Sequence, residues 1–363
     1  MEFSSSTISS YSVAIAMVLV QFAYGGSNIL IKVSFDKGLN QIVLVVYRHV
    51  IAILLLGPFA FVLERKQRSL ISFSLMAKIF VLALIGTTIQ LHVFYIGLHY
   101  TSATVASALN NALPSFTFLL AFLLGMEKVK ISSARSRAKV AGTFLCIAGS
   151  LVFTFWKGHY LFKSFTEKPL ININAPHIKE SWIKGCGLIL VGYTGWSVSL
   201  IQQAMILKVY PAPLSINTLI CFFVLLQNIV LAMFFARDPS IWKVDWNINL
   251  VTNFYCGVVN SAIVYYIQSW CISKKGPVFA AMFSPLQVVI VGIFSAVAFA
   301  ERFHVGSMVG SVLVIVGLYC VVWGKKMDTL VDENTEVDEK LELGMEKLEL
   351  GSSEKVVEIS CQK

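Results

Sequence analysis

Ten long apolar runs make up most of this chain and restrict the folds that it can adopt. Each run holds about 20 residues, the length of helix that crosses a bilayer core about 30 Å thick. The chain of 363 residues is 56% hydrophobic and 13% charged, whereas soluble domains contain roughly a quarter charged residues. The runs are residues 12–32, 41–63, 74–97, 102–124, 137–156, 184–207, 215–236, 251–272, 278–299 and 305–323. They predict an all-α integral membrane protein with ten transmembrane helices.

The alternatives to a helical bundle fit these runs poorly. Strands of a transmembrane barrel alternate apolar and polar residues over about ten positions, and these runs are continuous. The first run could be a signal peptide, but the eleven residues before it contain no Lys or Arg. Signal peptides begin with a basic segment, so we interpret the run as a retained helix.

Charge and composition divide the chain into five regions. Residues 324–363 hold 6 Lys and Arg against 11 Asp and Glu, whereas residues 1–323 hold 23 against 9. The net charge of +9 is therefore the sum of a basic membrane body and an acidic tail, and it indicates no nucleic-acid partner. Acidic low-complexity sequence is typical of disorder. The predicted regions are an N-terminal cytosolic segment (1–11), a first five-helix repeat (12–156), a loop (157–183), a second five-helix repeat (184–323) and an acidic disordered cytosolic tail (324–363).

The two halves resemble each other in sequence. Residues 95–114 match residues 266–285 at an offset of 171, and both segments end in a proline. Further matches are Gly25 with Gly195, Gly142 with Gly310 and Gly149 with Gly317. Because each half has an odd number of helices, the second must enter the membrane from the opposite side. The sequence therefore predicts two inverted repeats, with a substrate site between them near the midplane.

Two further features concern orientation and packing. Lys and Arg are concentrated in the segments 64–78 and 128–139, which by the positive-inside rule places both termini in the cytosol. The five lysines of 157–184 oppose this orientation. The glycines of 306–317 allow helices to approach closely, either within the chain or between the protomers of a homodimer.

Polar side chains within the apolar runs are the candidates for the substrate site, because they are costly in lipid and usually face a protein interior or cavity. Proline removes the hydrogen bond to the carbonyl four residues back, so Pro114 and Pro285 should free the carbonyls of Asn110 and Ala281. Alternatively, the polar groups satisfy one another across helix kinks. The predicted substrate-binding residues are Gln21, Asn28, Gln90, Asn110, Asn111, Pro114, Ser197, Gln202, Tyr266, Ser284, Pro285 and Gln287.

Charged groups are rare in the runs. Arg48 lies close enough to the end of its run to extend to the interface. His92 is the mid-membrane residue of a type that titrates near neutral pH, and we interpret it as a packed neutral histidine. No acidic residue lies in mid-run, which disfavours coupling to cations. The sequence contains no HExxH, GxSxG or Walker A motif, so we expect no catalytic residue, metal or cofactor. A receptor is the alternative class of membrane protein, and the internal duplication argues against it.

Each half contains an ordered series of short motifs. In the first half they are Gln21-Phe22, Tyr24-Gly25-Gly26, Lys32, Gly38, Tyr47-Arg48, Pro58, Glu64-Arg65-Lys66, Gly97, Tyr100-Thr101-Ser102-Ala103, Pro114-Ser115-Phe116-Thr117-Phe118 and Glu127-Lys128. In the second half they are Ser284-Pro285-Leu286, Glu301, Gly306-Ser307, Gly317-Leu318-Tyr319 and Trp323-Gly324-Lys325. Together they resemble the plant nodulin-like transporters, the UmamiT or Walls-Are-Thin-related group of the drug/metabolite transporter superfamily, which has two EamA-type domains.

This resemblance implies bidirectional, often proton-independent movement of amino acids, mainly as export at the plasma membrane. Some relatives act at the vacuole and some handle auxin. The absence of mid-run carboxylates agrees with transport down a gradient. We therefore expect an amino-acid facilitator in the plasma membrane, with the amino acid and the lipid bilayer as its partners. A transporter of auxin or another small plant metabolite, at the plasma membrane or vacuole, is the alternative.

Overall fold

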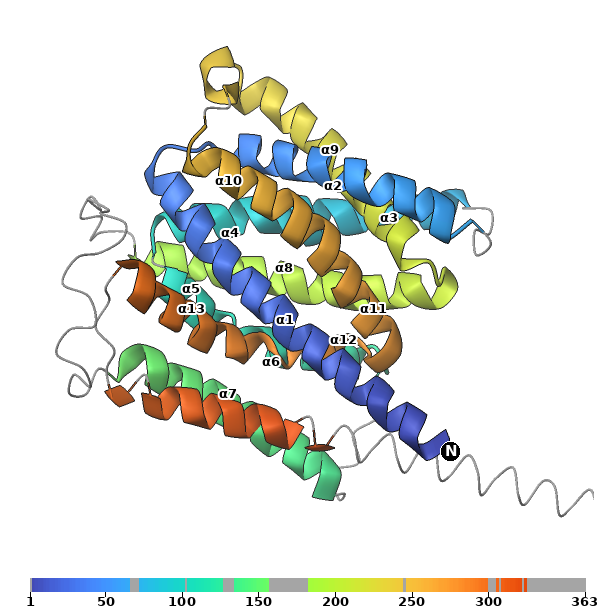
Figure 1. Ribbon diagram of the computed structural model, residues 1–363, viewed down its shortest axis with the longest axis vertical. Helices are drawn as coiled ribbons and strands as arrows, with labels where there is room; N and C mark the ends of the chain where they lie inside the picture. Colours follow the sequence, from blue (N-terminus) through green and yellow to red (C-terminus); the bar gives the residue numbers. More distant parts are fainter. Residues whose placement is uncertain are drawn as a thin grey trace, which may run out of the picture.

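The computed structural model is a bundle of helices, and no strand occurs among the residues that it describes (Figure 1). These residues are 2–65, 72–101, 103–126, 134–156, 182–243, 246–299, 305–306, 308–321 and 323–324. Residues 157–181, which form most of the predicted loop between the repeats, and the tail from residue 325 onward lie outside them.

The first half has helices where the sequence predicts them, with three differences. The first helix extends in both directions beyond its apolar run, and the fourth is broken at Asn110 and Asn111 instead of being continuous. A short π-helix, η1, interrupts the third. The elements are α1 (Glu2–Asp36), α2 (Gln41–Leu63), α3 (Phe73–Ala83), η1 (Leu84–Ile89), α4 (Gln90–His99), α5 (Ala103–Leu109), α6 (Ala112–Leu123) and α7 (Ala134–Phe155).

The second half repeats these irregularities. A π-helix, η3, interrupts its third helix, and its fourth is broken at Met282 and Phe283. The elements are α8 (Trp182–Val209), α9 (Pro213–Phe235), the 3-10 helix η2 (Pro239–Trp242), α10 (Ile248–Tyr255), η3 (Cys256–Val264), α11 (Tyr265–Lys275), α12 (Pro277–Ala281) and α13 (Ser284–Phe299). A shorter apolar helix, Met308–Val321, follows.

Length and composition qualify seven described segments as membrane spans. Each has at least 18 residues, enough helix to approach the thickness of the hydrocarbon core. The seven are Ser12–Asp36, Gln41–Leu63, Phe73–His99, Ile183–Val209, Pro213–Phe235, Ile248–Lys275 and Pro277–Phe294. Val140–Gly149 and Met308–Val321 are shorter apolar segments. The chain is a multi-pass membrane protein.

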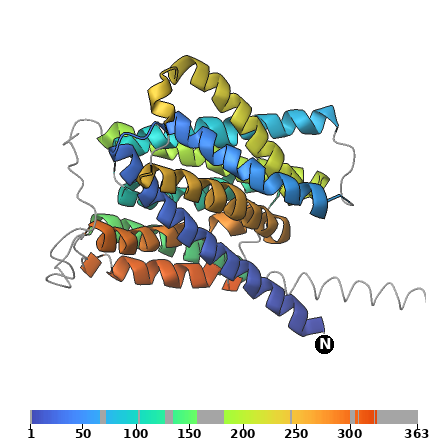
Figure 2. The ribbon, with the colours of Figure 1, turned by 45° about the horizontal axis from the view of Figure 1, so that its top comes forward.

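Each of the main contacts between the two halves has a counterpart in which the halves change places. Helix α1 packs on α13 and α11, and its counterpart α8 packs on α6 and α4. Helix α2 packs on η3, and its counterpart α9 packs on η1, while α2 and α9 pack on each other. In Figures 1 and 2, α1 crosses one face of the bundle diagonally over elements of the second half. The halves are therefore interleaved instead of lying side by side.

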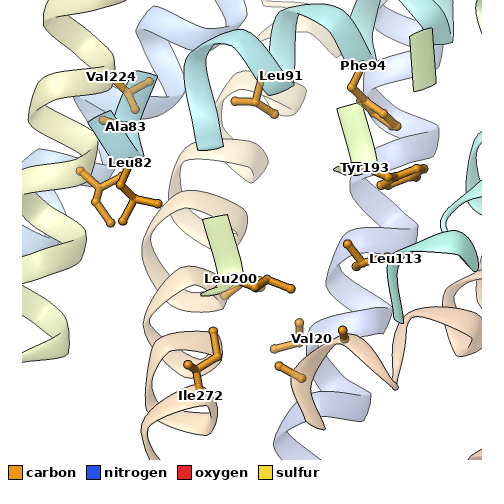
Figure 3. Close-up of a cluster of buried hydrophobic side chains, with 14 of the residues drawn as sticks. Val20, Leu82, Ala83, Leu91, Phe94, Leu113, Tyr193, Leu200, Val224 and Ile272 are labelled. Carbon is orange, nitrogen blue, oxygen red and sulfur yellow. The ribbon is translucent and has the colours of Figure 1, made fainter. Parts of the chain in front are cut away.

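Apolar side chains from both halves form the core between these helices. Figure 3 shows side chains from α1, α4, α6, α8 and α11 converging, among them Val20, Leu91, Leu113, Leu200 and Ile272. All five are buried. The same core therefore fixes the two halves relative to each other.

Helix α7 and the helix Met308–Val321 lie together at one side of the bundle in both views (Figures 1 and 2). A Cβ atom added at Gly142 would lie 2.6 Å from the carbonyl oxygen of Gly317, and one at Gly149 would lie 2.9 Å from that of Gly310. Such distances are too short for any side chain. The seven-spaced glycines therefore join two helices of one chain, and the interpretation of these glycines as contacts between protomers is wrong.

Helices α2 and α9 are fastened to each other differently at their two ends. At the end of α2, both carboxylate oxygens of Glu64 accept backbone N–H groups of α9, from Leu214 at 2.8 Å and Ser215 at 2.7 Å. An anion at a helix N-terminus is favourable because the N–H groups there lack partners. At the opposite end, the Tyr47 hydroxyl donates to the carbonyl of Trp242 at 2.8 Å.

Candidate functional site

A cavity of about 100 Å³ lies between the two halves, and helices from both halves contribute to it. Its lining is predominantly polar or aromatic, which is unusual for the interior of a bundle of apolar helices. The lining residues are Met17, Gln21, Tyr24, Ser27, Asn28, Ile31, Arg48, Gln90, Leu91, Phe94, Tyr95, Asn110, Leu113, Tyr193, Trp196, Leu200, Asn260, Tyr265, Gln268, Ala280, Ala281, Ser284 and Gln287.

Six of the predicted substrate-binding residues line this cavity. They come from α1, α4, the break between α5 and α6, and α13, and all six are buried: Gln21, Asn28, Gln90, Asn110, Ser284 and Gln287. The Asn110 amide nitrogen donates to Gln287 Oε1 at 2.5 Å. This hydrogen bond joins the two broken helices across the boundary between the halves.

The other six predicted residues are not part of the cavity lining. Asn111, Pro114 and Pro285 are buried in or next to the helix breaks. The Ser197 hydroxyl lies within hydrogen-bond distance of the carbonyls of Tyr193 and Leu113. Two face other spaces: Tyr266 lines a wider pocket at the end of α2, and Gln202 lines a groove beside α3.

The predicted free carbonyl at the first helix break is not free. The backbone N–H of Leu113 donates to the carbonyl of Asn110 at 3.0 Å. The chain tightens by one residue at the break, so that a donor three residues away replaces the one that Pro114 lacks. The Asn110 side chain, rather than its carbonyl, is what this break presents to the cavity.

Arg48 does not extend to the membrane interface, and the prediction that it does is wrong. Its side chain is 2% exposed and lines the cavity. Nε donates to Ser261 Oγ at 2.8 Å, and Nη1 donates to Tyr95 Oη at 2.8 Å. Both acceptors come from neighbouring helices that the sequence position of Arg48 does not reveal.

Aromatic residues form a wall that sequence reasoning missed. The Tyr24 hydroxyl donates to Gln268 Oε1 at 2.7 Å, and its ring lies edge-on to Trp196 with centroids 6.5 Å apart. The Trp196 and Tyr265 centroids are 6.0 Å apart. Aromatic residues are common in transmembrane helices, so their type carried no signal. Only the packing of three separate helices brings these rings together.

His92 lies away from the cavity. Its Nε2 lies 2.6 Å from Asn228 Oδ1 on α9, and the side chain is partly buried. Because an amide oxygen only accepts hydrogen bonds, Nε2 carries a proton in this pair. His92 therefore connects the third helix to α9 and is not in contact with solute in the cavity.

Comparisons with known proteins identify the class of molecule. The model of the EamA-like transporter family matches residues 11–155 and again residues 183–323. The chain belongs to the EamA-like transporter family. It is 39% identical over 321 residues to Protein WALLS ARE THIN 1 of Arabidopsis thaliana, covering 86% of this chain and 82% of that one.

Other relatives and one solved structure agree. A WAT1-related protein of Arabidopsis thaliana is 38% identical over 357 residues, covering 93% of this chain and 89% of its own. An auxin-induced protein of Pinus taeda is 36% identical over 85% of this chain and 78% of its own. One crystal structure superposes with a TM-score of 0.59 at 14% identity, covering 88% of this chain and 98% of its own. That last likeness shows the fold alone.

The two ends of the cavity in this EamA-family transporter differ. A second pocket of about 790 Å³ lies at the end of the bundle where α2 ends. We call this pocket the vestibule, and its lining includes Lys208, Lys274 and Pro277. Vestibule and cavity are separated along α12 by the distance from Pro277 to Ala281, about one helical turn.

At the opposite end, polar contacts surround the C-terminal end of α1. Lys32 Nζ donates to the carbonyl of Leu98 at 3.2 Å and forms an ion pair with Asp36 at 3.4 Å. The hydroxyls of Ser34 and Thr252 share a hydrogen bond of 2.7 Å. The two ends therefore differ: a wide pocket lies beyond one end of the cavity, and polar contacts hold α1 to α4 and α10 at the other.

Proposed function

We propose that the protein is a bidirectional facilitator and exporter of amino acids that works by alternating access down a concentration gradient. The observation that carries this proposal is the polar cavity between the halves, with a wide vestibule beyond one end and polar contacts between helices at the other. In the proposed cycle, a solute held there would be reached from one side at a time. Movement of the interleaved halves about the cavity would open the opposite side.

Ten transmembrane helices in two inverted repeats belong to this proposal. The seven long apolar segments become ten spans when α5 with α6, α7 and the helix Met308–Val321 are added. The exchange of helix contacts between the halves supports an inverted arrangement, as do the π-helix and the helix break that occur in each half. Such repeats place substrate sites at the boundary between the halves.

The cavity lining supports transport without proton coupling. Coupling to protons in transporters uses Asp, Glu or His groups along the path. No such side chain lines the described cavity. The solute would then move according to its own gradient, and at equal concentrations on both sides no net movement should occur.

Efflux measurements test the proposal. Oocytes that express the chain and are loaded with radiolabelled glutamine should release it faster than water-injected oocytes, and an inward gradient of glutamine should drive uptake at the same external pH. Loss of glutamine movement together with rapid efflux of labelled indole-3-acetate would favour the alternative. Absence of flux for every solute, with the protein present at the surface, would contradict transport and favour a receptor.

Auxin or a related small plant metabolite is the second candidate substrate. The wall formed by Tyr24, Trp196 and Tyr265 favours it, because aromatic rings stack on an indole. The same two labelled solutes distinguish the candidates in the assay above.

The proposed location is the plasma membrane, with the vacuolar membrane as the alternative and both termini in the cytosol. This orientation places the vestibule on the cytosolic side. A fluorescent fusion imaged against markers of both membranes tests the location. Association as a homodimer is also part of the proposal, and the mass of the purified protein in nanodiscs tests it.

A further inference from the structure

Arg48 is a buried cation whose partners in the described part of the chain are neutral. Its guanidinium group keeps its charge and has five N–H donors in a planar fork. The two hydrogen bonds given above go to hydroxyl groups of Ser261 and Tyr95. Hydroxyl groups satisfy donors but do not neutralise a charge. Burying an ion without a counter-charge is unfavourable, more so in a membrane.

The acidic side chains whose surroundings the structure describes are all engaged elsewhere. Asp36 pairs with Lys32 at the end of the bundle opposite the vestibule. Glu64 binds the N-terminus of α9, and Asp238 accepts from the backbone N–H of Ser240 on the exposed surface. No carboxylate is among the residues that line the cavity. The negative charge that complements Arg48 must then come from outside these residues.

We propose that Arg48 binds the carboxylate of the transported solute, so that the substrate class is small carboxylic acids. This inference rests on the proposed transport function and adds the group that determines specificity. Arginine binds carboxylates through two parallel hydrogen bonds. Arg48 lies on the cavity surface, where a solute can reach it.

The remainder of the cavity has acceptors for the other end of such a solute. Gln90 Oε1 and Asn260 Oδ1 are buried in the lining without a hydrogen-bond partner. Buried acceptors without partners are rare in folded proteins, and an N–H group of a solute would satisfy them. The ammonium group of an amino acid and the indole N–H of an indole acid both provide this chemistry. The vestibule adds Lys208 and Lys274, which raise the local concentration of anions.

The binding test compares free acids with amides of the same shape. Titration calorimetry on the purified chain in nanodiscs uses phenylalanine against phenylalaninamide, and indole-3-acetate against indole-3-acetamide. The free acid of at least one pair should bind about 10- to 100-fold more tightly than its amide, the usual effect of a charge-assisted pair. Arg48→Met should abolish this preference, and Arg48→Lys should retain part of it, because a single ammonium keeps the charge but not the fork. Whichever pair shows the preference identifies the source of the carboxylate.

Thermal stability separates an anchor from a structural arginine. If Arg48 serves the solute, Arg48→Met should leave the melting midpoint of the ligand-free protein unchanged or raise it, because the variant no longer buries an unpaired charge. The bound acid should raise the midpoint of the native chain and not that of the variant. The matched control is Arg237→Met, since Arg237 is exposed and its Nε donates to the carbonyl of Met233. That control should keep the preference for free acids.

Three results would overturn the proposal: equal affinity for acid and amide in the native chain, a preference that persists in Arg48→Met, or binding of none of the four probes. Flux in proteoliposomes separates this inference from the proposed function. Acid-selective binding that depends on Arg48 but is accompanied by no flux would contradict transport and still support carboxylate binding by Arg48. Flux that is equal for acids and amides and unaffected by Arg48→Met would contradict the anchor and leave transport in place.

Discussion

Helices α2 and α9 are counterparts in the two halves, and they agree in backbone but differ in chemistry. Each has 23 residues, and the two pack on each other. The eighth residue of α2 is Arg48, whereas the eighth residue of α9 is Ile220, which is buried in the apolar core. The repeat therefore reproduces the architecture of the transporter while only one half supplies the charge at the cavity.

The ends of the same two helices differ in the same way. Glu64 follows the last residue of α2 and caps α9, whereas Ala236 follows the last residue of α9 and has no polar side chain. Helix packing is alike in the two halves because both need the same close contacts. Side chains that bind solute, or that cap a helix of the other half, differ between the halves. Substitutions at symmetry-related positions should then have equal effects in packing and unequal effects in chemistry.

The largest effect is expected where the halves are alike. Gly149→Leu and Gly317→Leu, at symmetry-related positions, should each destabilise the protein by about 3 kcal/mol or more, because a side chain at either position collides with the backbone of the other helix. Melting of the detergent-solubilised protein, followed by size-exclusion chromatography, measures this. Gly57→Leu on α2 is the control, since a Cβ there meets nothing within 4 Å. Unequal losses at the two glycines would break the symmetry of packing.

The second effect concerns the cap that one half has and the other lacks. Glu64→Ala should lower the free energy of unfolding by about 2 to 3 kcal/mol, because two buried N–H groups of α9 lose a charged acceptor. Glu64→Gln retains a neutral acceptor and should lose about half as much. The same melting assay applies. A Glu64→Ala protein as stable as the native chain would mean that the cap does not join the halves.

The third effect makes the two helix breaks more alike. Asn110→Ala gives position 110 the same residue as its counterpart Ala281, at an offset of 171. It also removes the hydrogen bond to Gln287. Flux of the labelled solute should fall about tenfold, equivalent to about 1.4 kcal/mol in the barrier, with surface abundance unchanged.

Gln287→Leu provides the matched control for that substitution, because it removes the other partner. It should reduce flux to a similar extent, and the double variant should be no worse than either single one if the two side chains act as a pair. Unchanged flux in both single variants would assign Asn110 and Gln287 to packing.

The smallest effect is at the end of the α2 and α9 pair opposite Glu64. Tyr47→Phe removes one hydrogen bond to the carbonyl of Trp242 and should cost about 1 kcal/mol of stability. Tyr319→Phe, at an exposed position of the helix Met308–Val321, is the control and should have no effect. A Tyr47→Phe cost equal to that of Glu64→Ala would mean that the two ends are held equally well.

The helices were predictable, and the prolines indicated which two of them are irregular, because both features depend on neighbouring residues. Apolar runs of about 20 residues specify spans in lipid, and the prolines at 114 and 285 marked the helices that the structure breaks a few residues earlier. The π-helices at Leu84–Ile89 and Cys256–Val264 were not predicted, since no residue type marks an extra residue in a helical turn.

The polar residues of the cavity were predictable only in part. Polar groups in apolar runs must avoid lipid, and Asn28, Gln90 and Gln287 do line the cavity. The same criterion could not distinguish residues that line the cavity from residues that make polar contacts elsewhere between helices. Ser197 and Tyr266 satisfied the same criterion and lie elsewhere. Which polar group faces an empty space depends on the rotation of each helix, and that is set by contacts across the whole bundle.

By itself the sequence determined a membrane protein of apolar helices, a duplicated chain and a membrane body without mid-helix carboxylates. These properties follow from composition and spacing along the chain. Only the tertiary structure decided the role of Arg48, because its sequence position near a helix end predicted contact with the interface. The burial of Arg48 and the neutrality of its neighbours result from Ser261 and Tyr95, which lie 213 and 47 residues away in the chain. The charge balance around Arg48 depends on residues that are distant in the chain, so only the folded protein determines it.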